Sequence, residues 1–228
     1  MKEMNSLFVA RWRRLCVAGL ALLVLSACSL LKPTATPPPT FYSLDRPPGS
    51  TMAAGPITAP TLIVNPPRAA AGFDSQRIIY VRQAHQLEYF AHSEWVDTPA
   101  RMLAPLIVAA LDRSGRFRAV IATPTAASAD LRLDTEIVRL QHQFGATPSQ
   151  VRLTLRATLS DNATRQVLAQ ADLDQRADAP SEDAYGGVIA ANRATQAMLQ
   201  ALAAFCSQAA EQWQAREGSA GRRAVGRL

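Results

Sequence analysis

The feature of this sequence that most constrains its fold is a strict alternation of residue types over two consecutive segments, 131–137 and 151–159. Apolar side chains stand at the odd positions, with Thr135 as the one exception, and charged or hydroxyl-bearing side chains stand at the even positions. Successive side chains of a β-strand point to opposite faces, so each segment is predicted to be a strand with one buried and one solvent-exposed face. Such strands are typical of antiparallel sheets. A third run, 165–175, follows a predicted turn at Asp161 and extends the pair into a three-stranded meander.

Shorter apolar runs predict four more strands, at 41–44, 61–64, 76–82 and 87–91, the last two joined as a hairpin. A helix is predicted to follow, with Asp97 or Thr98 as N-cap, Pro99 in its first turn and Gly115 just past its end. Its interior Pro105 removes a backbone donor and predicts a kink or a later start.

A second helix is predicted over about 181–215, with Ser181 as N-cap and an alanine-rich apolar stripe that suits close packing on a sheet. The elements together predict an α+β fold, in which a mainly antiparallel sheet carries two helices on one face. About 200 residues suffice for one domain and leave little room for two.

Residues 1–27 are predicted to be a lipoprotein signal peptide. Four basic residues precede or begin an apolar run, Leu15 to Leu25, which is too short to span a bilayer as a helix. The run ends in Leu25-Ser26-Ala27-Cys28, which is similar to the bacterial lipoprotein signal, an aliphatic residue and two small residues before a cysteine. Cys28 is therefore the predicted lipidation site, carrying S-diacylglyceryl and N-acyl groups such as palmitate. The alternative is an ordinary secretory signal with a chance cysteine.

The predicted order along the chain is the signal peptide 1–27, a tether 28–40, the folded domain 41–215 and a disordered arginine-rich tail 216–228. The tether is rich in proline, and at about 3.1 Å per residue it would hold the domain roughly 30–40 Å from the lipid. Ser29 follows the cysteine, in place of the aspartate that often retains similar lipoproteins at the inner membrane. The predicted location is the periplasmic face of the outer membrane.

Composition excludes several classes of protein. The net charge of +6 falls to +3 once residues 1–27 are removed, so the high pI is no argument for nucleic-acid binding. Lys2 and Lys32 are the only lysines, and no P-loop motif is present. Cys206 would be the only free thiol of the mature chain, which excludes an intramolecular disulfide and a multi-cysteine zinc site.

No residue pattern predicts catalysis, a metal site or a cofactor. His85, His92 and His142 lack any metal-ligand spacing and are predicted to be exposed. Cys206 is predicted to lie in the core, and no G-x-S-x-G nucleophile motif occurs. The carboxylates of Asp134 and Glu136 are predicted to face solvent opposite arginines on the neighbouring strand.

The order of several short motifs resembles the ABC-type transport auxiliary lipoprotein family, the PqiC-like group, over about residues 40–212. These motifs, after the Cys28 signal, are Phe41-Tyr42-Ser43-Leu44, Leu62-Ile63-Val64, Ile78-Ile79-Tyr80-Val81-Arg82, Trp95 before the Pro99 helix, Phe117-Arg118-Ala119-Val120, Ala129-Asp130-Leu131-Arg132-Leu133 and Tyr185 at the last helix. The resemblance implies a non-catalytic outer-membrane component of an MCE-type system, which moves lipids or other hydrophobic molecules between the two membranes. Its implied partner is the periplasmic MCE-domain protein, and only Cys28 is carried over as a functional residue.

Two alternatives stay open. A lipid-binding carrier would need a deep apolar cavity between the helices and the sheet. A structural or assembly lipoprotein would act as a homo-oligomer through its sheet edges and polar faces.

Overall fold

The computed structural model describes residues 37–45 and 55–225, with side chains to residue 219. Cys28, the signal peptide and most of the tether lie outside the described residues. The chain divides into two units, Met1–Pro38 and Pro39–Leu228, and all the elements below belong to the second. In chain order they are β1 (Thr40–Tyr42), β2 (Thr61–Val64), β3 (Arg68–Ala69), β4 (Arg77–Val81), β5 (Glu88–Trp95), α2 (Pro99–Arg113), β6 (Ala119–Ala122), β7 (Leu131–Gln143), β8 (Gln150–Asp161), β9 (Val167–Asp178) and α3 (Ala184–Val225).

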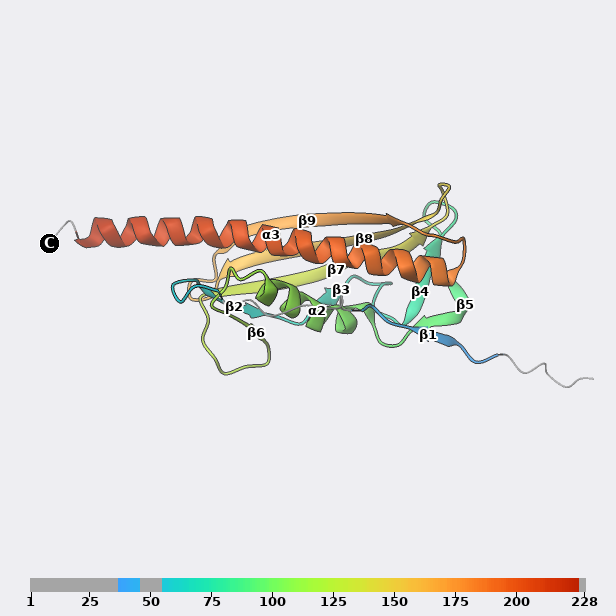
Figure 1. Ribbon diagram of the computed structural model, residues 1–228, viewed down its shortest axis with the longest axis horizontal. Helices are drawn as coiled ribbons and strands as arrows, with labels where there is room; N and C mark the ends of the chain where they lie inside the picture. Colours follow the sequence, from blue (N-terminus) through green and yellow to red (C-terminus); the bar gives the residue numbers. More distant parts are fainter. Residues whose placement is uncertain (1–36, 46–54, 226–228) are drawn as a thin grey trace, which may run out of the picture. The chain divides into compact units, whose positions relative to one another are not determined.

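The predicted meander forms the largest part of the sheet. β7 pairs antiparallel with β8 along its whole length, and β8 pairs antiparallel with β9 (Figure 1). The odd residues of β7 as far as Ile137 are buried, and a register shift between Ile137 and Arg139 then moves the buried positions. The alternation in sequence therefore predicted both the strands and the faces that they bury.

The second edge of β7 carries parallel strands: β2 and β4 were predicted as strands, but β3, β6 and the parallel pairing were not. β2, β3 and β4 pair with successive parts of β7, and β6 and β5 lie beyond β2 and β4. Each of the five parallel pairings joins only two to four residue pairs, whereas the two meander ladders are long. The prediction of a mainly antiparallel α+β fold is confirmed, with this mixed half as an addition.

Helix α2 begins where the sequence predicted. Thr98 is its N-cap and Pro99 its first residue, and Gly115 follows it with a φ of 62°, a conformation that glycine adopts without a steric penalty. The helix continues through Pro105 to Arg113, so the later start that Pro105 suggested is not seen.

Helix α3 differs from its prediction at both ends. Asp183, rather than Ser181, caps it, because its Oδ1 accepts a hydrogen bond from the backbone N–H of Gly186 at 2.7 Å. The helix continues to Val225, ten residues beyond the predicted end, through a segment that had been predicted to be disordered. Glutamate, alanine and arginine in that segment are good helix formers, which offset the cost of Gly218 and Gly221.

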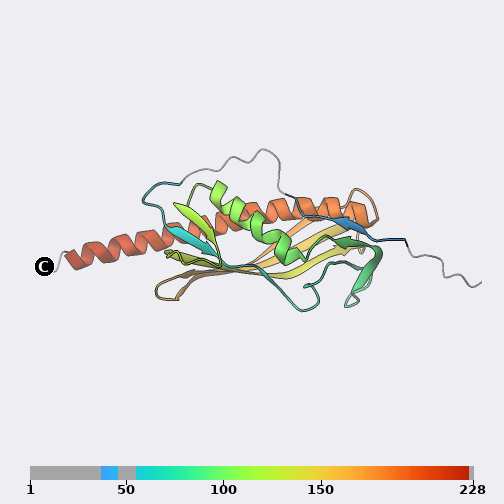
Figure 2. The same ribbon diagram turned by 90° about the horizontal axis from the view of Figure 1, so that it is seen from below.

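Both helices lie on the same side of the sheet (Figure 2). The core fills the space between them and the inward side chains of the meander. Its largest fully buried side chains are Leu62, Leu103, Ile107, Leu111, Leu131, Leu133, Ile137, Leu153, Leu155, Leu159, Met198 and Leu202. No helix of the described residues lies on the opposite side of β7, β8 and β9.

Candidate functional site

The uncovered side of the meander forms a surface that we call the polar sheet face. It consists of the outward side chains of the three strands: Arg132, Asp134, Glu136 and Arg139 on β7, Arg152, Thr154, Arg156 and Thr158 on β8, and Gln170, Asp172, Asp174 and Arg176 on β9. The outward carboxylates that the sequence predicted are therefore in place. Five arginines stand among four carboxylates, so the face is close to neutral.

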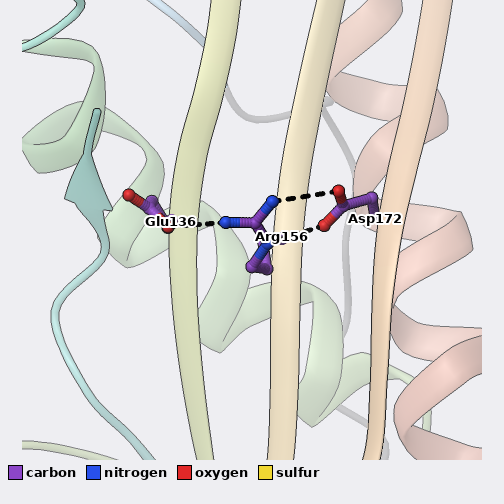
Figure 3. Close-up of polar contacts among 3 residues, drawn as sticks. All are labelled: Glu136, Arg156 and Asp172. Carbon is purple, nitrogen blue, oxygen red and sulfur yellow. Dashed lines mark hydrogen bonds and ion pairs between the residues drawn. The ribbon is translucent and has the colours of Figure 1, made fainter. Parts of the chain in front are cut away.

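One row of the polar sheet face crosses all three strands. Arg156 donates from Nε and Nη2 to the two carboxylate oxygens of Asp172, at 2.9 and 3.1 Å, and from Nη1 to Glu136 at 3.4 Å (Figure 3). The hydrogen bond to Asp172, and next the charge of that carboxylate, raise the pKa of Arg156 above its usual value. This two-pronged geometry fixes the orientation of the guanidinium plane.

The neighbouring row is built around Asp174. Its carboxylate accepts hydrogen bonds from Nε of Arg152 at 2.8 Å and from the hydroxyl of Thr154 at 2.7 Å, and Arg176 lies 3.7 Å away. Partial burial acts to raise the pKa of Asp174, but these donors outweigh it and the pKa is lowered. These two rows therefore present fixed, paired charges, which suit contact with a polar surface rather than proton transfer.

His142 lies in the core, so the prediction that it is exposed is wrong. The residue is 2% exposed, at the end of β7 where the shifted register turns it inward. Its Nε2 is hydrogen-bonded to Oγ of Ser149 at 2.7 Å, and the backbone N–H of Ser149 donates to Glu182 at 2.9 Å. Burial lowers the pKa of His142, although the charges of Glu182 and Asp183 act to raise it. His85 and His92 are exposed, as predicted.

The His142 and Ser149 pair does not have the arrangement of a nucleophile and its base. The acid, Glu182, holds Ser149 rather than the ring, and Nδ1 of His142 has no hydrogen-bond partner among the described residues. Ser149 is completely buried, so no substrate reaches its hydroxyl.

Cys206 is also unsuited to chemistry. It lies in the core, as predicted, and burial raises the pKa of its thiol to about 12. The thiolate, which is the nucleophile, is therefore absent near neutral pH.

An apolar groove lies at the far edge of the mixed half of the sheet. Its volume is about 500 Å³, and its walls come from one side of α2 and from β2 and β6 with the residues that follow each strand: Val64, Asn65, Pro66, Ala104, Pro105, Val108, Ala109, Asp112, Arg113, Val120, Ala122 and Thr123. Sequence reasoning missed this groove because β6 itself was missed. The short apolar run Ala119–Ala122 was its signal, although four residues without alternation do not distinguish a strand from a loop.

Among the described residues, no group of three or more histidine, cysteine, aspartate or glutamate side chains is arranged to hold a metal ion. No helix in the same residues is long and apolar enough to cross a membrane.

Several solved structures are similar to this chain in fold. A Xanthomonas campestris protein assigned to the family model DUF330 superposes with a TM-score of 0.66 at 21% identity, covering 77% of this chain and 98% of its own. An uncharacterized protein has a TM-score of 0.57 at 11% identity, covering 73% of this chain and 97% of its own. A hypothetical protein from Chlamydia trachomatis has a TM-score of 0.47 at 11% identity, covering 69% of this chain and 98% of its own. Among curated proteins no match is found.

The sequence itself gives the more specific comparison. The family model for the ABC-type transport auxiliary lipoprotein component matches residues 42–203, from β1 to the middle of α3. This range covers α2, the first half of α3 and nearly the whole sheet, and it agrees with the span of the resemblance seen in the motifs. The chain therefore belongs to the family of ABC-type transport auxiliary lipoprotein components.

Proposed function

We propose that this chain is the non-catalytic outer-membrane component of an MCE-type ABC transport system, which moves lipids or other hydrophobic molecules between the inner and outer membranes. The observation that carries the proposal is the family match over residues 42–203. The buried Ser149 and Cys206 agree with a role in docking rather than in chemistry.

The proposal assigns anchoring to Cys28, on the periplasmic face of the outer membrane. Each buried CH₂ of an acyl chain contributes about 0.8 kcal/mol, so two or three chains hold a protein stably on a bilayer. Confinement by the tether also raises the effective concentration of the domain for an MCE-domain protein that reaches across the periplasm.

Affinity capture from membranes tests the partner. A tagged full-length chain should recover an MCE-domain protein, together with its ATPase and permease. Repeated captures without any MCE-domain protein would refute the assignment. Labelling with radioactive palmitate tests the anchor separately: Cys28→Ser should lose the label and leave the membrane, and Cys206→Ser, the matched control, should keep both.

The packing of α3 against β4, β5, β7 and β8 gives little support to a lipid carrier. The cavity lined by Ile78, Trp95 and His142 below α3 has a volume of about 10 Å³, roughly the space of one water molecule. A carrier of this kind would need room for an acyl chain at that interface.

Self-association remains a second candidate, and the length of β9 favours it. β9 has twelve residues and pairs only with β8 among the described strands, so a long row of backbone groups stays open. A defined oligomer of the purified chain, measured by light scattering without any transporter subunit, would support this function. A monomer at micromolar concentration would refute it.

A further inference from the structure

β6 is an edge strand whose outer side has no partner strand among the described residues. The backbone N–H of Asn65 donates to Leu133 on β7, and the N–H of Thr123 donates to Val64 on β2. In a parallel pair alternate residues bond to the same neighbour, so the odd residues of β6 face β2. The N–H and C=O groups of Val120 and Ala122 therefore point outward, away from the sheet.

β6 also lacks the features by which proteins usually protect an edge. Its four residues, Ala119–Ala122, are all apolar and at least partly exposed, and none is charged or a proline. Free edges normally carry charges, prolines or bulges that prevent another strand from pairing. The outer edge of β9, in contrast, belongs to a strand with Asp172, Asp174 and Arg176.

The apolar groove adjoins this edge. The side chains of Val120 and Ala122 form one of its walls, and Val108 and Pro105 of α2 form part of the other. An edge strand beside a helix, with an apolar groove between them, is the arrangement in which an extended peptide adds a strand. Its backbone then bonds to the edge, and alternate side chains enter the groove.

The charges of the groove indicate which occupant fits. Its two charged wall residues, Asp112 and Arg113, have opposite signs, so the groove offers no excess charge to a phospholipid headgroup. We propose that β6 and the groove bind an uncharged, extended segment of a partner protein, which adds as a strand at Val120 and Ala122 and places aliphatic side chains against Val108. The proposal goes beyond the transport role and does not require that the partner be an MCE-domain protein.

Site-specific photocrosslinking in cells tests this proposal. The full-length chain would carry p-benzoylphenylalanine in place of Arg118, an exposed residue immediately before β6. After irradiation of intact cells, the crosslinked peptide would be sequenced by mass spectrometry. The expected product is one uncharged segment of a second protein.

Three variants distinguish strand addition from general contact. Ala122→Pro removes an outward N–H but keeps an apolar side chain, and should lower the yield roughly threefold to tenfold, as the loss of one hydrogen bond implies. Ala122→Ser keeps the N–H and should lower the yield less than Ala122→Pro does. Gln170→Pro is the matched control on β9. The backbone N–H of Ala179 donates to Ser149, and the N–H direction alternates along a strand, so the odd residues of β9 face β8. Gln170 is an even residue, and its N–H therefore points outward.

Val108→Asp tests the groove without changing a strand, because Val108 lies on α2. The charge that it places in the groove should also lower the crosslinking yield. The proposal is overturned if the crosslink goes to phospholipid, to a second copy of the chain or to residues 46–54, or if none forms. Equal yields from Ala122→Pro and Gln170→Pro in folded protein also overturn it.

Discussion

Gly187 offers a sharp test of the packing between α3 and β7. It lies in the first turns of α3, where alanine is ordinarily the better residue: glycine in a helix interior costs about 0.8–1.0 kcal/mol relative to alanine. A Cβ at this position would lie 2.6 Å from Nδ1 of His142, 3.2 Å from its Cε1 and 3.3 Å from its Cγ. The first of these separations is well inside van der Waals contact.

The imidazole ring of His142 has little freedom to move aside. Its Nε2 is held by Ser149 at 2.7 Å, and its ring centroid lies 4.2 Å from that of Phe144. Overpacking of a buried site typically costs about 1–3 kcal/mol, which exceeds the gain in helix propensity. Gly187→Ala is therefore expected to lower the free energy of unfolding by up to about 2 kcal/mol, the difference between these two effects.

Urea unfolding of the mature chain, followed by tryptophan fluorescence, measures this free energy. In a His142→Ser background the clash is absent, and Gly187→Ala should then stabilise the protein by up to about 1 kcal/mol. Gly218→Ala is the control, because no described atom outside the adjoining backbone of its own helix lies within 4 Å of its Cβ position, and it should leave stability unchanged or slightly higher. A stabilising Gly187→Ala in the wild-type background would refute the reasoning.

Three other outcomes are expected. Because the pKa of His142 is lowered in the folded chain, the unfolded chain binds more protons at this residue once the pH falls below the ordinary histidine pKa of 6.5. The free energy of unfolding should therefore decrease as the pH is lowered from 7.5 to 5, and it should decrease less in His142→Gln. Urea titrations at each pH measure both changes. Cys206 should resist maleimide labelling in the native state and react fully in denaturant; rapid native labelling would contradict its burial. Leu202→Ala should lower the free energy of unfolding, measured by thermal unfolding, by about 2–5 kcal/mol. Leu87→Ala, at an exposed position, should change it by no more than about 0.5 kcal/mol, and equal effects of the two substitutions would place Leu202 outside the core.

Periodicity predicted the elements that depend on one buried face. The alternation in 131–137 and 151–159 gave β7 and β8 together with the direction in which Asp134 and Glu136 point. Pro99 and Gly115 predicted where α2 begins and ends, because proline and glycine restrict or permit particular backbone conformations at their own positions.

Features that depend on partners far along the chain were not predictable in this way. The parallel strands β2, β4 and β6 are short, and their pairing depends on where intervening segments return to β7. The burial of His142 depends on a register shift after Ile137, which one sequence does not reveal. The sequence did not identify Asp183 as the N-cap of α3, because Ser181 and Glu182 precede it and an oxygen-bearing side chain therefore stands at each of these three positions.

By itself the sequence determined the α+β class and the long meander, because residue period and turn residues are local properties of the chain. The lipoprotein signal before Cys28 stays a prediction from an equally local motif. The tertiary structure decided which edges and surfaces are available for binding. The polar sheet face stays open because both helices pack on the other side. The groove exists because α2 and β6, neighbours in sequence, leave a gap beside an edge that no described strand fills. Availability of a surface depends on everything that packs around it, and only the folded chain specifies that.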